Sequence, residues 1–268
     1  MTIDPSSFET VLYEAEGGVG RITLNRPERR NALNRRAYAE LEAAFRHVQT
    51  DPAAVCVVVT GTDPAFCSGE DVKEMMTGEA RPAPTAQETA AARPTPAAMA
   101  VLECDKPVIA AVNGPAVGWG MELALYADIR LASTRAVFAE LFIRRGLICD
   151  VGGLTRLPAI VGPTKATELL LSGDAIDAEE ALRLGLVSKV WQHEDLMGEA
   201  LAYAGRIAAG PPLALMAMKR ALRQSLFPRD AEIGAAAIGE IRRLFATEDH
   251  REGVRSFLEK RAPVFVGR

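Results

Sequence analysis

The sequence predicts an α/β protein, because short apolar runs alternate along the chain with segments of helical spacing. Residues 55–60 and 108–112 are continuous apolar or β-branched runs, as is typical of strands buried on both faces. Each of these runs leads into a glycine turn. Alternation of this kind favours parallel strand pairing with right-handed crossovers.

The order of the elements follows from the same patterns. Residues 11–24 alternate around a glycine turn, which predicts a hairpin. Residues 34–49 place apolar side chains at helical spacing, which predicts a helix before the first buried strand. The alternation then continues with strands at 108–112 and 129–132, and with helices at 121–126 and 164–171.

Two segments depart from this alternation. Residues 77–100 are rich in Ala, Pro, Thr and Glu, so we expect a mobile surface excursion with a short helix at most, and a role as a lid stays open. From residue 200 onward the pattern is helical. We therefore expect a core, residues 1–199, and a helical C-terminal region, residues 200–268, that packs on the core or on a neighbouring subunit.

Composition narrows the function classes. The net charge of -4, from 31 basic and 35 acidic side chains, gives no field that would attract nucleic acid. The apolar runs are far shorter than the ~20 residues of a membrane span, and the N-terminus lacks the pattern of a signal peptide. Four separated cysteines are typical of reduced thiols. We expect a soluble cytoplasmic protein.

Several kinds of site are disfavoured as well. The three histidines have no ligand spacing, so neither a metal site nor a histidine-based triad is expected. Neither a GxGxxG nor a GxxxxGK[ST] motif is present, so we expect no nucleotide cofactor.

The candidate chemistry lies in two glycine turns, Ser68-Gly69-Glu70 and Gly118-Trp119-Gly120, each of which joins a buried strand to a helix. The first N–H groups of a helix have no partner within it, and the helix dipole favours negative charge there. If the two turns face each other, they form an oxyanion hole. The alternative is that these glycines only permit tight turns.

Several motifs in register resemble the enoyl-CoA hydratase/isomerase family, the crotonase superfamily. The resemblance extends to about Val190 and rests on 25–34, 66–75, 113–130, 146–162 and 181–190. It implies a crotonase-like spiral of strand-strand-helix units, a C-terminal helical region for trimerisation, and a homotrimer or a dimer of trimers. It also implies an acyl-CoA thioester substrate, with no cofactor beyond the coenzyme A that is part of it.

The same resemblance assigns site residues. The oxyanion donors would be the main-chain N–H groups of Glu70 and Trp119, where many relatives have glycine at the second position. Substrate-binding positions would be Arg26, Arg30, Ala32, Ser68, Asp71, Val72, Lys73, Gly118 and Phe142. A solvated basic face is the alternative for any single arginine.

The reactions of this family differ in the acidic residues that they use. Family hydratases use two glutamates; the first matches Glu122, whereas the second falls on Phe142. Glu140 lies two residues earlier and would reach the site only if the backbone is extended there. Asp150 matches an aspartate that moves protons in dienoyl-CoA and related isomerases, and its alternative reading is a turn or cap residue.

One carboxylate can carry a proton between two carbons, whereas hydration favours two carboxylates in different protonation states. We therefore expect catalytic Asp150 and Glu122, and double-bond isomerisation of an enoyl-CoA through an oxyanion-stabilised enolate. The alternatives are hydration of a 2-enoyl-CoA and a catalytically weak family member that binds acyl-CoA.

Overall fold

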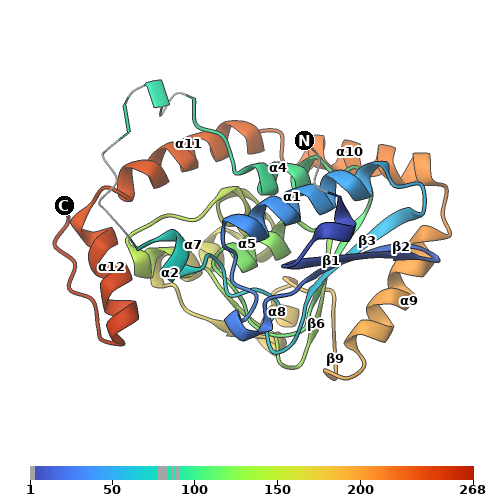
Figure 1. Cartoon of the computed structure of the whole chain (residues 1–268), viewed down its shortest axis with the longest axis horizontal. Coiled ribbons are helices and arrows are strands. Elements are labelled where there is room, and N and C mark those ends of the chain that lie inside the picture. Colours follow the sequence, from blue (N-terminus) through green and yellow to red (C-terminus); the bar gives the residue numbers. More distant parts are fainter. Residues whose placement is uncertain (1–3, 78–83, 86, 89–90) are drawn as a thin grey trace.

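The computed structural model describes residues 4–77, 84–85, 87–88 and 91–268. Its main sheet has six strands in the order β1-β2-β3-β4-β6-β9 (Figure 1). Their bounds are β1 Val11–Glu16, β2 Gly18–Leu24, β3 Ala54–Gly61, β4 Val108–Val112, β6 Ile129–Ser133 and β9 Lys189–Trp191. The hairpin β1–β2 is antiparallel and all later pairings in this sheet are parallel, which confirms the predicted α/β class.

A smaller sheet lies where the parallel strands end. It contains β5 (Ala116–Val117), β7 (Val137–Ala139) and β8 (Ile176–Asp177), in the order β5-β7-β8. Two isolated bridges, Leu33 to Glu70 and Cys67 to Ala116, join the loops around it. The chain thus makes repeated strand-strand-helix turns, and the predicted crotonase-like spiral is confirmed.

Helices cover both faces of the main sheet (Figure 1). On one face α9 (Leu196–Ala208) buries Leu196, Ala200 and Ala204 against Val58 and Ile109. On the other face lie α1 (Arg35–Thr50), α4 (Pro96–Glu103) and α5 (Trp119–Tyr126). The side chain of Asn34 caps α1 by accepting a hydrogen bond from the Ala37 N–H, which explains why the helix begins there.

The other helices among the described residues are shorter or belong to the C-terminal region. They are α2 Val72–Met75, α6 Leu157–Val161, α7 Pro163–Ser172, α8 Ala178–Arg183, α10 Pro212–Leu226, α11 Asp230–Leu244 and α12 Glu248–Glu259. A 3₁₀ helix, Leu141–Arg145, and a π-helical turn, Gly152–Arg156, lie beside the site. Helix α11 packs on the π-helical turn and α12 on the 3₁₀ helix.

Two expectations need comment. Within 77–100, residues 78–83, 86 and 89–90 lie outside the described part of the chain. The prediction of a surface excursion is wrong from Pro96 on, because α4 buries Ala97, Ala98 and Ala100, whose small side chains pack closely on α1. The expected boundary at residue 200 falls inside α9, which begins at Leu196.

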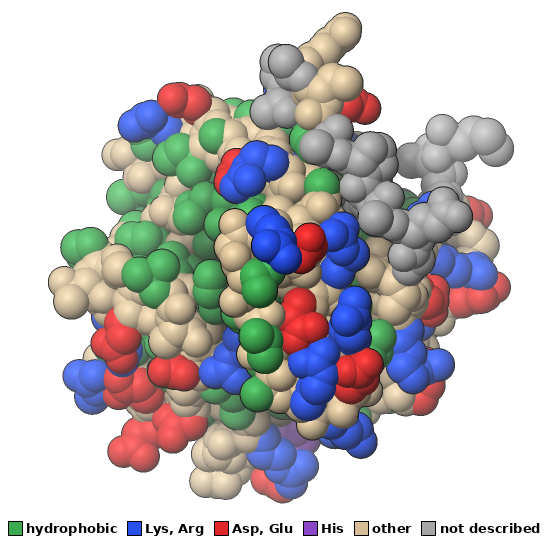
Figure 2. Space-filling model, turned by 90° about the vertical axis from the view of Figure 1, so that its left-hand side faces the viewer, with side chains coloured by type: hydrophobic (Ala, Val, Ile, Leu, Met, Phe, Trp, Pro, Cys, Tyr) green, Lys and Arg blue, Asp and Glu red, His purple; other side chains and the backbone are tan. Residues whose placement is uncertain are grey.

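The distribution of charged side chains on the surface is in line with the small net charge of the chain. On the face that carries α12, basic and acidic side chains are interspersed (Figure 2). Among the described residues, no helix has the length and apolar character needed to cross a bilayer. All four cysteines are buried and free.

Candidate active site

The two glycine turns are joined by main-chain hydrogen bonds. The Val117 N–H donates to the Cys67 carbonyl at 2.9 Å, and the Cys67 N–H donates to the Pro115 carbonyl at 3.0 Å. A Cβ atom at Gly120 would lie 2.1 Å from the Cys67 oxygen, so only glycine permits this approach. The turns that the sequence predicted separately therefore form one unit.

The two turns that carry the predicted oxyanion donors lie side by side in this unit. Trp119 is the first residue of α5, so its N–H has no partner within the helix. Gly69 and Gly118 have φ values of 86° and 54°, in the left-handed region that favours glycine. A Cβ atom at Gly69 would lie 3.3 Å from the Trp119 nitrogen. The geometry thus brings the Glu70 and Trp119 turns together.

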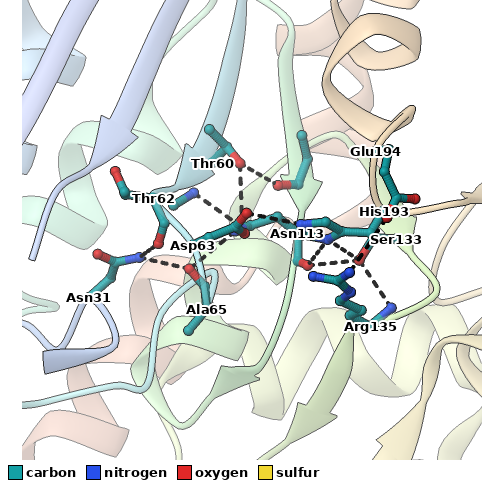
Figure 3. Close-up of polar contacts among 12 residues, drawn as sticks. Asn31, Thr60, Thr62, Asp63, Ala65, Asn113, Ser133, Arg135, His193 and Glu194 are labelled. Carbon is teal, nitrogen blue, oxygen red and sulfur yellow. Dashed lines mark hydrogen bonds and ion pairs between the residues drawn. The ribbon is translucent and has the colours of Figure 1, made fainter. Parts of the chain in front are cut away.

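A polar network holds the loops that lead into both turns (Figure 3). The Asn31 side-chain amide donates to two carbonyls of the loop after β3, those of Thr62 and Ala65, at 2.7 Å each. In the same loop, the Asp63 carboxylate accepts a hydrogen bond from the Asn113 amide at 2.8 Å. Because Asn113 directly follows β4, this bond ties the ends of β3 and β4 together.

His193 completes the network from the β9 side of the sheet. Its Nε2 lies 2.9 Å from the Asp63 carboxylate and its Nδ1 lies 3.1 Å from the Asn113 carbonyl (Figure 3). Burial would raise the pKa of Asp63, but the Asn113 amide and His193 outweigh it and hold that pKa below its ordinary value. Sequence reasoning missed Asp63 and His193 as partners, since they are far apart in the chain and share no motif.

Two cavities meet at the predicted oxyanion hole. The larger, of about 450 Å³, is also lined by Ala91, by 93–96, by Ile238 and Ile241 of α11, and by Phe245, which follows that helix. The smaller has about 60 Å³ and reaches Ser68, Val72 and Arg145. Both are lined by Glu70, Trp119, Phe142 and Leu147.

The Trp119 indole is the aromatic wall at this junction. It is 4% exposed and packs edge-to-face against Tyr38 and Tyr126, with ring centroids 5.0 and 6.0 Å away. The indole therefore occupies space beside the cavity.

Three buried carboxyl groups, those of Glu122, Glu140 and Asp150, lie together at the larger cavity. Glu122 is fully buried and accepts hydrogen bonds from the N–H groups of Gly152 and Gly153, at 2.7 and 3.0 Å. Burial and the neighbouring Asp150 raise the pKa of Glu122 to about 8. Glu140 is 2% exposed, and neither of its oxygens has a hydrogen-bond partner among the described residues. Burial, Glu122 and Asp150 raise the pKa of Glu140 well above its ordinary value.

Asp150 is the member of this cluster that lines the larger cavity; the cavity wall includes neither Glu122 nor Glu140. One of its carboxyl oxygens accepts a hydrogen bond from the Val151 N–H at 2.7 Å. Burial raises the pKa of Asp150 despite this bond. Phe142 lines both cavities and presents an apolar ring to them.

The predicted substrate-binding residues fall into two groups. Ser68, Val72, Gly118 and Phe142 line the smaller cavity together with Arg145, which sequence reasoning did not single out. The Arg26 guanidinium instead donates to the Ala32 carbonyl at 2.6 Å and pairs with Asp71 at 3.2 Å and Glu74 at 3.1 Å.

The other predicted contacts lie around this pair. Asp71 caps α2 by accepting from the Glu74 N–H, while Arg30 and Lys73 are exposed. Within the described ranges, no group of three His, Cys, Asp or Glu residues is placed to hold a metal ion.

Comparison with known proteins agrees with this architecture. Residues 14–268 match the family model described as enoyl-CoA hydratase/isomerase. The chain is 38% identical to a crotonyl-CoA hydratase of Syntrophomonas wolfei, over 98% of this chain and 100% of that one. It is 35% identical to the 1,2-epoxyphenylacetyl-CoA isomerase of Escherichia coli, over 97% and 100%.

A solved enoyl-CoA hydratase from Mycobacterium avium subsp. paratuberculosis has a TM-score of 0.84 and 27% identity, over 96% of this chain and 99% of that one. The likeness therefore includes both the spiral and the helical C-terminal region. Since the family model spans the turns, the acid cluster and α11, the chain belongs to the enoyl-CoA hydratase/isomerase family.

Proposed function

We propose that this enzyme moves the double bond of an enoyl-CoA by a proton shift through a thioester enolate. One observation carries the proposal: of the three buried carboxyl groups, Asp150 is the one that lines the cavity shared with Glu70 and Trp119. A single carboxylate facing the acyl group suits a reaction in which one base removes and returns the same proton.

In the proposed reaction, ionised Asp150 takes a proton from the carbon at one end of the allylic system. The electron pair moves toward the thioester, and the N–H groups of Glu70 and Trp119 stabilise the enolate oxygen. A fixed donor of this kind typically contributes about 3 kcal/mol to lowering the barrier. Asp150 then returns the proton to the other end, so atoms and charge balance without water or a redox partner.

Glu122 has a supporting part in this proposal. Its two oxygens are held by the N–H groups of Gly152 and Gly153, and its raised pKa of about 8 keeps it uncharged at neutral pH. A neutral Glu122 leaves Asp150 as the ionised group that faces the substrate. The proposal therefore assigns proton transfer to Asp150 and support of the Asp150 segment to Glu122.

Hydration of a 2-enoyl-CoA is the second candidate, because Glu122 occupies the place of one hydratase acid and relatives such as the Syntrophomonas wolfei protein are named hydratases. Phe142 argues against it, since an apolar ring lines the cavity where the resemblance places the other acid. Hydration would still have two acids if Glu122 and Asp150 both took part in proton transfer.

Ultraviolet assays separate these reactions. Gain of conjugation with a 3-enoyl-CoA supports isomerisation, and loss of conjugation with a 2-enoyl-CoA supports hydration. Silence with both, despite measurable binding of coenzyme A thioesters, supports a binding protein with weak catalysis. The variant Asp150→Asn should abolish isomerisation and retain binding, whereas unchanged turnover would overturn the role of Asp150.

The proposed assembly is a homotrimer or a dimer of trimers. Helix α10 leaves large apolar side chains exposed, with Leu213 at 81%, Met218 at 63% and Leu226 at 61%. Burial of this helix against a second copy would remove apolar surface from water.

A further inference from the structure

Tyr126 lies behind the acid cluster, one helical turn after Glu122 on α5. It is 2% exposed, and its hydroxyl makes no hydrogen bond of ordinary geometry with any described residue. The same hydroxyl lies beside the carboxyl groups of both Glu122 and Asp150.

The chemistry of the hydroxyl limits what it can do there. A phenol carries one proton, so it can donate to one carboxylate at a time. Leaving a buried hydroxyl without a partner typically costs about 1–3 kcal/mol, so the proton should turn to whichever neighbour is ionised. Glu122 already accepts two main-chain hydrogen bonds, whereas Asp150 accepts one from Val151.

We propose that Tyr126 is a positioning residue for Asp150: its hydroxyl donates to the ionised Asp150 carboxylate and holds that carboxylate toward the acyl cavity. This inference rests on the proposed isomerisation. It adds to that proposal the group that sets the pH above which Asp150 is ionised and can accept a proton. A hydrogen bond from Tyr126 to one carboxylate oxygen of Asp150 would keep the other oxygen directed at the substrate.

The charges around Tyr126 agree with this role. Burial, Glu122 and Asp150 raise the pKa of Tyr126 well above its ordinary value, so it stays a donor across the working range. The tyrosine in turn lowers the pKa of Asp150 against the larger effect of burial. Glu140 also faces the cluster and Cys149 lies beside it, and burial raises the pKa of both groups, so both are neutral when Asp150 titrates.

Basic groups lie on the other side of Tyr126. The tyrosine borders a separate cavity of about 210 Å³ that is also lined by Arg130 and Arg156. Arg130 donates to the Ala127 carbonyl at 2.8 Å, and Arg156 pairs with Asp230 at 2.8 Å. Both guanidinium groups are thus engaged away from the three carboxyl groups.

The test is the pH profile of kcat/KM for isomerisation of a 3-enoyl-CoA. In Tyr126→Phe the acid limb should move upward by about one pH unit, because the ionised base loses a donor. Below the limb, kcat/KM should therefore fall about tenfold, while the plateau changes little. A purely structural role would lower the plateau without moving the limb.

Two variants serve as controls. Tyr13→Phe removes a hydroxyl that bonds Asp51 at 2.6 Å, away from the site, and should leave the limb in place. Glu140→Gln removes the other buried neighbour and should also leave the limb in place. Should Tyr126→Phe fold poorly, 3-fluorotyrosine at position 126 keeps the ring and strengthens the donor, and the limb should then move to lower pH.

The outcomes are distinguishable. A limb that stays put in Tyr126→Phe, or that moves in Glu140→Gln instead, overturns the role of Tyr126. If Asp150→Asn retains full turnover, the proposed function itself fails. If Asp150→Asn is inactive but the acid limb of Tyr126→Phe does not move, only the positioning role of Tyr126 is overturned.

Discussion

A carboxyl oxygen of Glu122 accepts a hydrogen bond from the main-chain N–H of Gly152 at 2.7 Å, across 30 residues of sequence. This bond ties α5, which begins with Trp119, to the segment that carries Asp150. Together with the hydrogen bond from the Gly153 N–H at 3.0 Å, it links the Trp119 turn to the segment of the proposed base.

Gly152→Ala should break that contact. A Cβ atom at residue 152 would lie 2.3 Å from the Glu122 carboxylate, so the acid or the Asp150 segment must move. We expect a loss of about 1–3 kcal/mol in the free energy of unfolding and a fall in kcat of at least about tenfold. Denaturant unfolding and single-turnover kinetics measure the two effects.

Gly198→Ala is the matched control for this variant. Gly198 lies in α9 with no atom within 4 Å of an added Cβ, so alanine should leave activity unchanged and stability equal or higher. Equal damage from both substitutions would contradict the role assigned to Gly152.

Stability should fall as pH rises through the neutral range. The pKa of Glu122 is raised to about 8, above the ~4.3 of an unfolded glutamate, so the folded state binds its proton more tightly. The contribution of Glu122 to the free energy of unfolding is fully present below about pH 4. It is lost between about pH 4 and about pH 8, at up to roughly 1.4 kcal/mol per pH unit. Glu140 acts in the same direction.

The variant Glu122→Gln should show a shallower slope of unfolding free energy against pH than the parent chain, whatever its absolute stability. Chemical denaturation at several pH values between about 5 and 8 gives both slopes. Identical slopes would mean that Glu122 does not carry the raised pKa.

Phe142→Glu should shift the reaction toward hydration. The ring of Phe142 lines both cavities, at the place where the family resemblance puts the second hydratase acid. A carboxylate there could deprotonate water, so we expect the ratio of hydration to isomerisation to rise about tenfold or more. Phe142→Gln, which has similar size without the acid, should leave the ratio unchanged.

Asp63→Asn should loosen the turns that carry Glu70 and Trp119, although Asp63 itself is not a proposed substrate contact. Asp63 accepts from Asn113 at 2.8 Å and lies 2.9 Å from His193, so its loss should lower kcat more than it changes KM (Figure 3). We expect a fall of about tenfold, from displaced oxyanion donors. A rise in KM at constant kcat would argue for a direct binding role instead.

The same variant has a predicted pH signature. The folded-state pKa of Asp63 is lowered, so its stabilising effect is present above the unfolded pKa and is lost as pH falls through the folded pKa. The difference in melting temperature between Asp63→Asn and the parent chain should therefore be largest near neutral pH and shrink in acid. A difference that grows in acid would contradict this assignment.

The assembly can be tested through α10. Light scattering should give the mass of a trimer or hexamer, and Leu213→Glu should lower it, because Leu213 is 81% exposed on the helix proposed to be buried. Gln224→Glu adds the same charge to the same helix and should leave the mass unchanged. A monomeric parent chain would overturn the proposed assembly.

Local sequence determined the secondary elements and the two turns. The run Val108–Val112 is a strand with the predicted bounds, and the glycines at 69 and 118 adopt the left-handed conformations that their turns require. These features depend on the side chains and backbone freedom of neighbouring residues, which the sequence displays directly. The family resemblance then placed Glu70, Trp119, Glu122 and Asp150 in one site.

Only the tertiary structure decided how the acids and bases are used. Arg26, a predicted substrate contact, is engaged by the Ala32 carbonyl, Asp71 and Glu74. Glu140 and Tyr126 join Glu122 and Asp150 in one buried cluster, and Ile238 and Ile241 of α11 line the larger cavity from far along the chain. Burial and electrostatic contact depend on distances between segments far apart in the chain, and no local pattern encodes those distances.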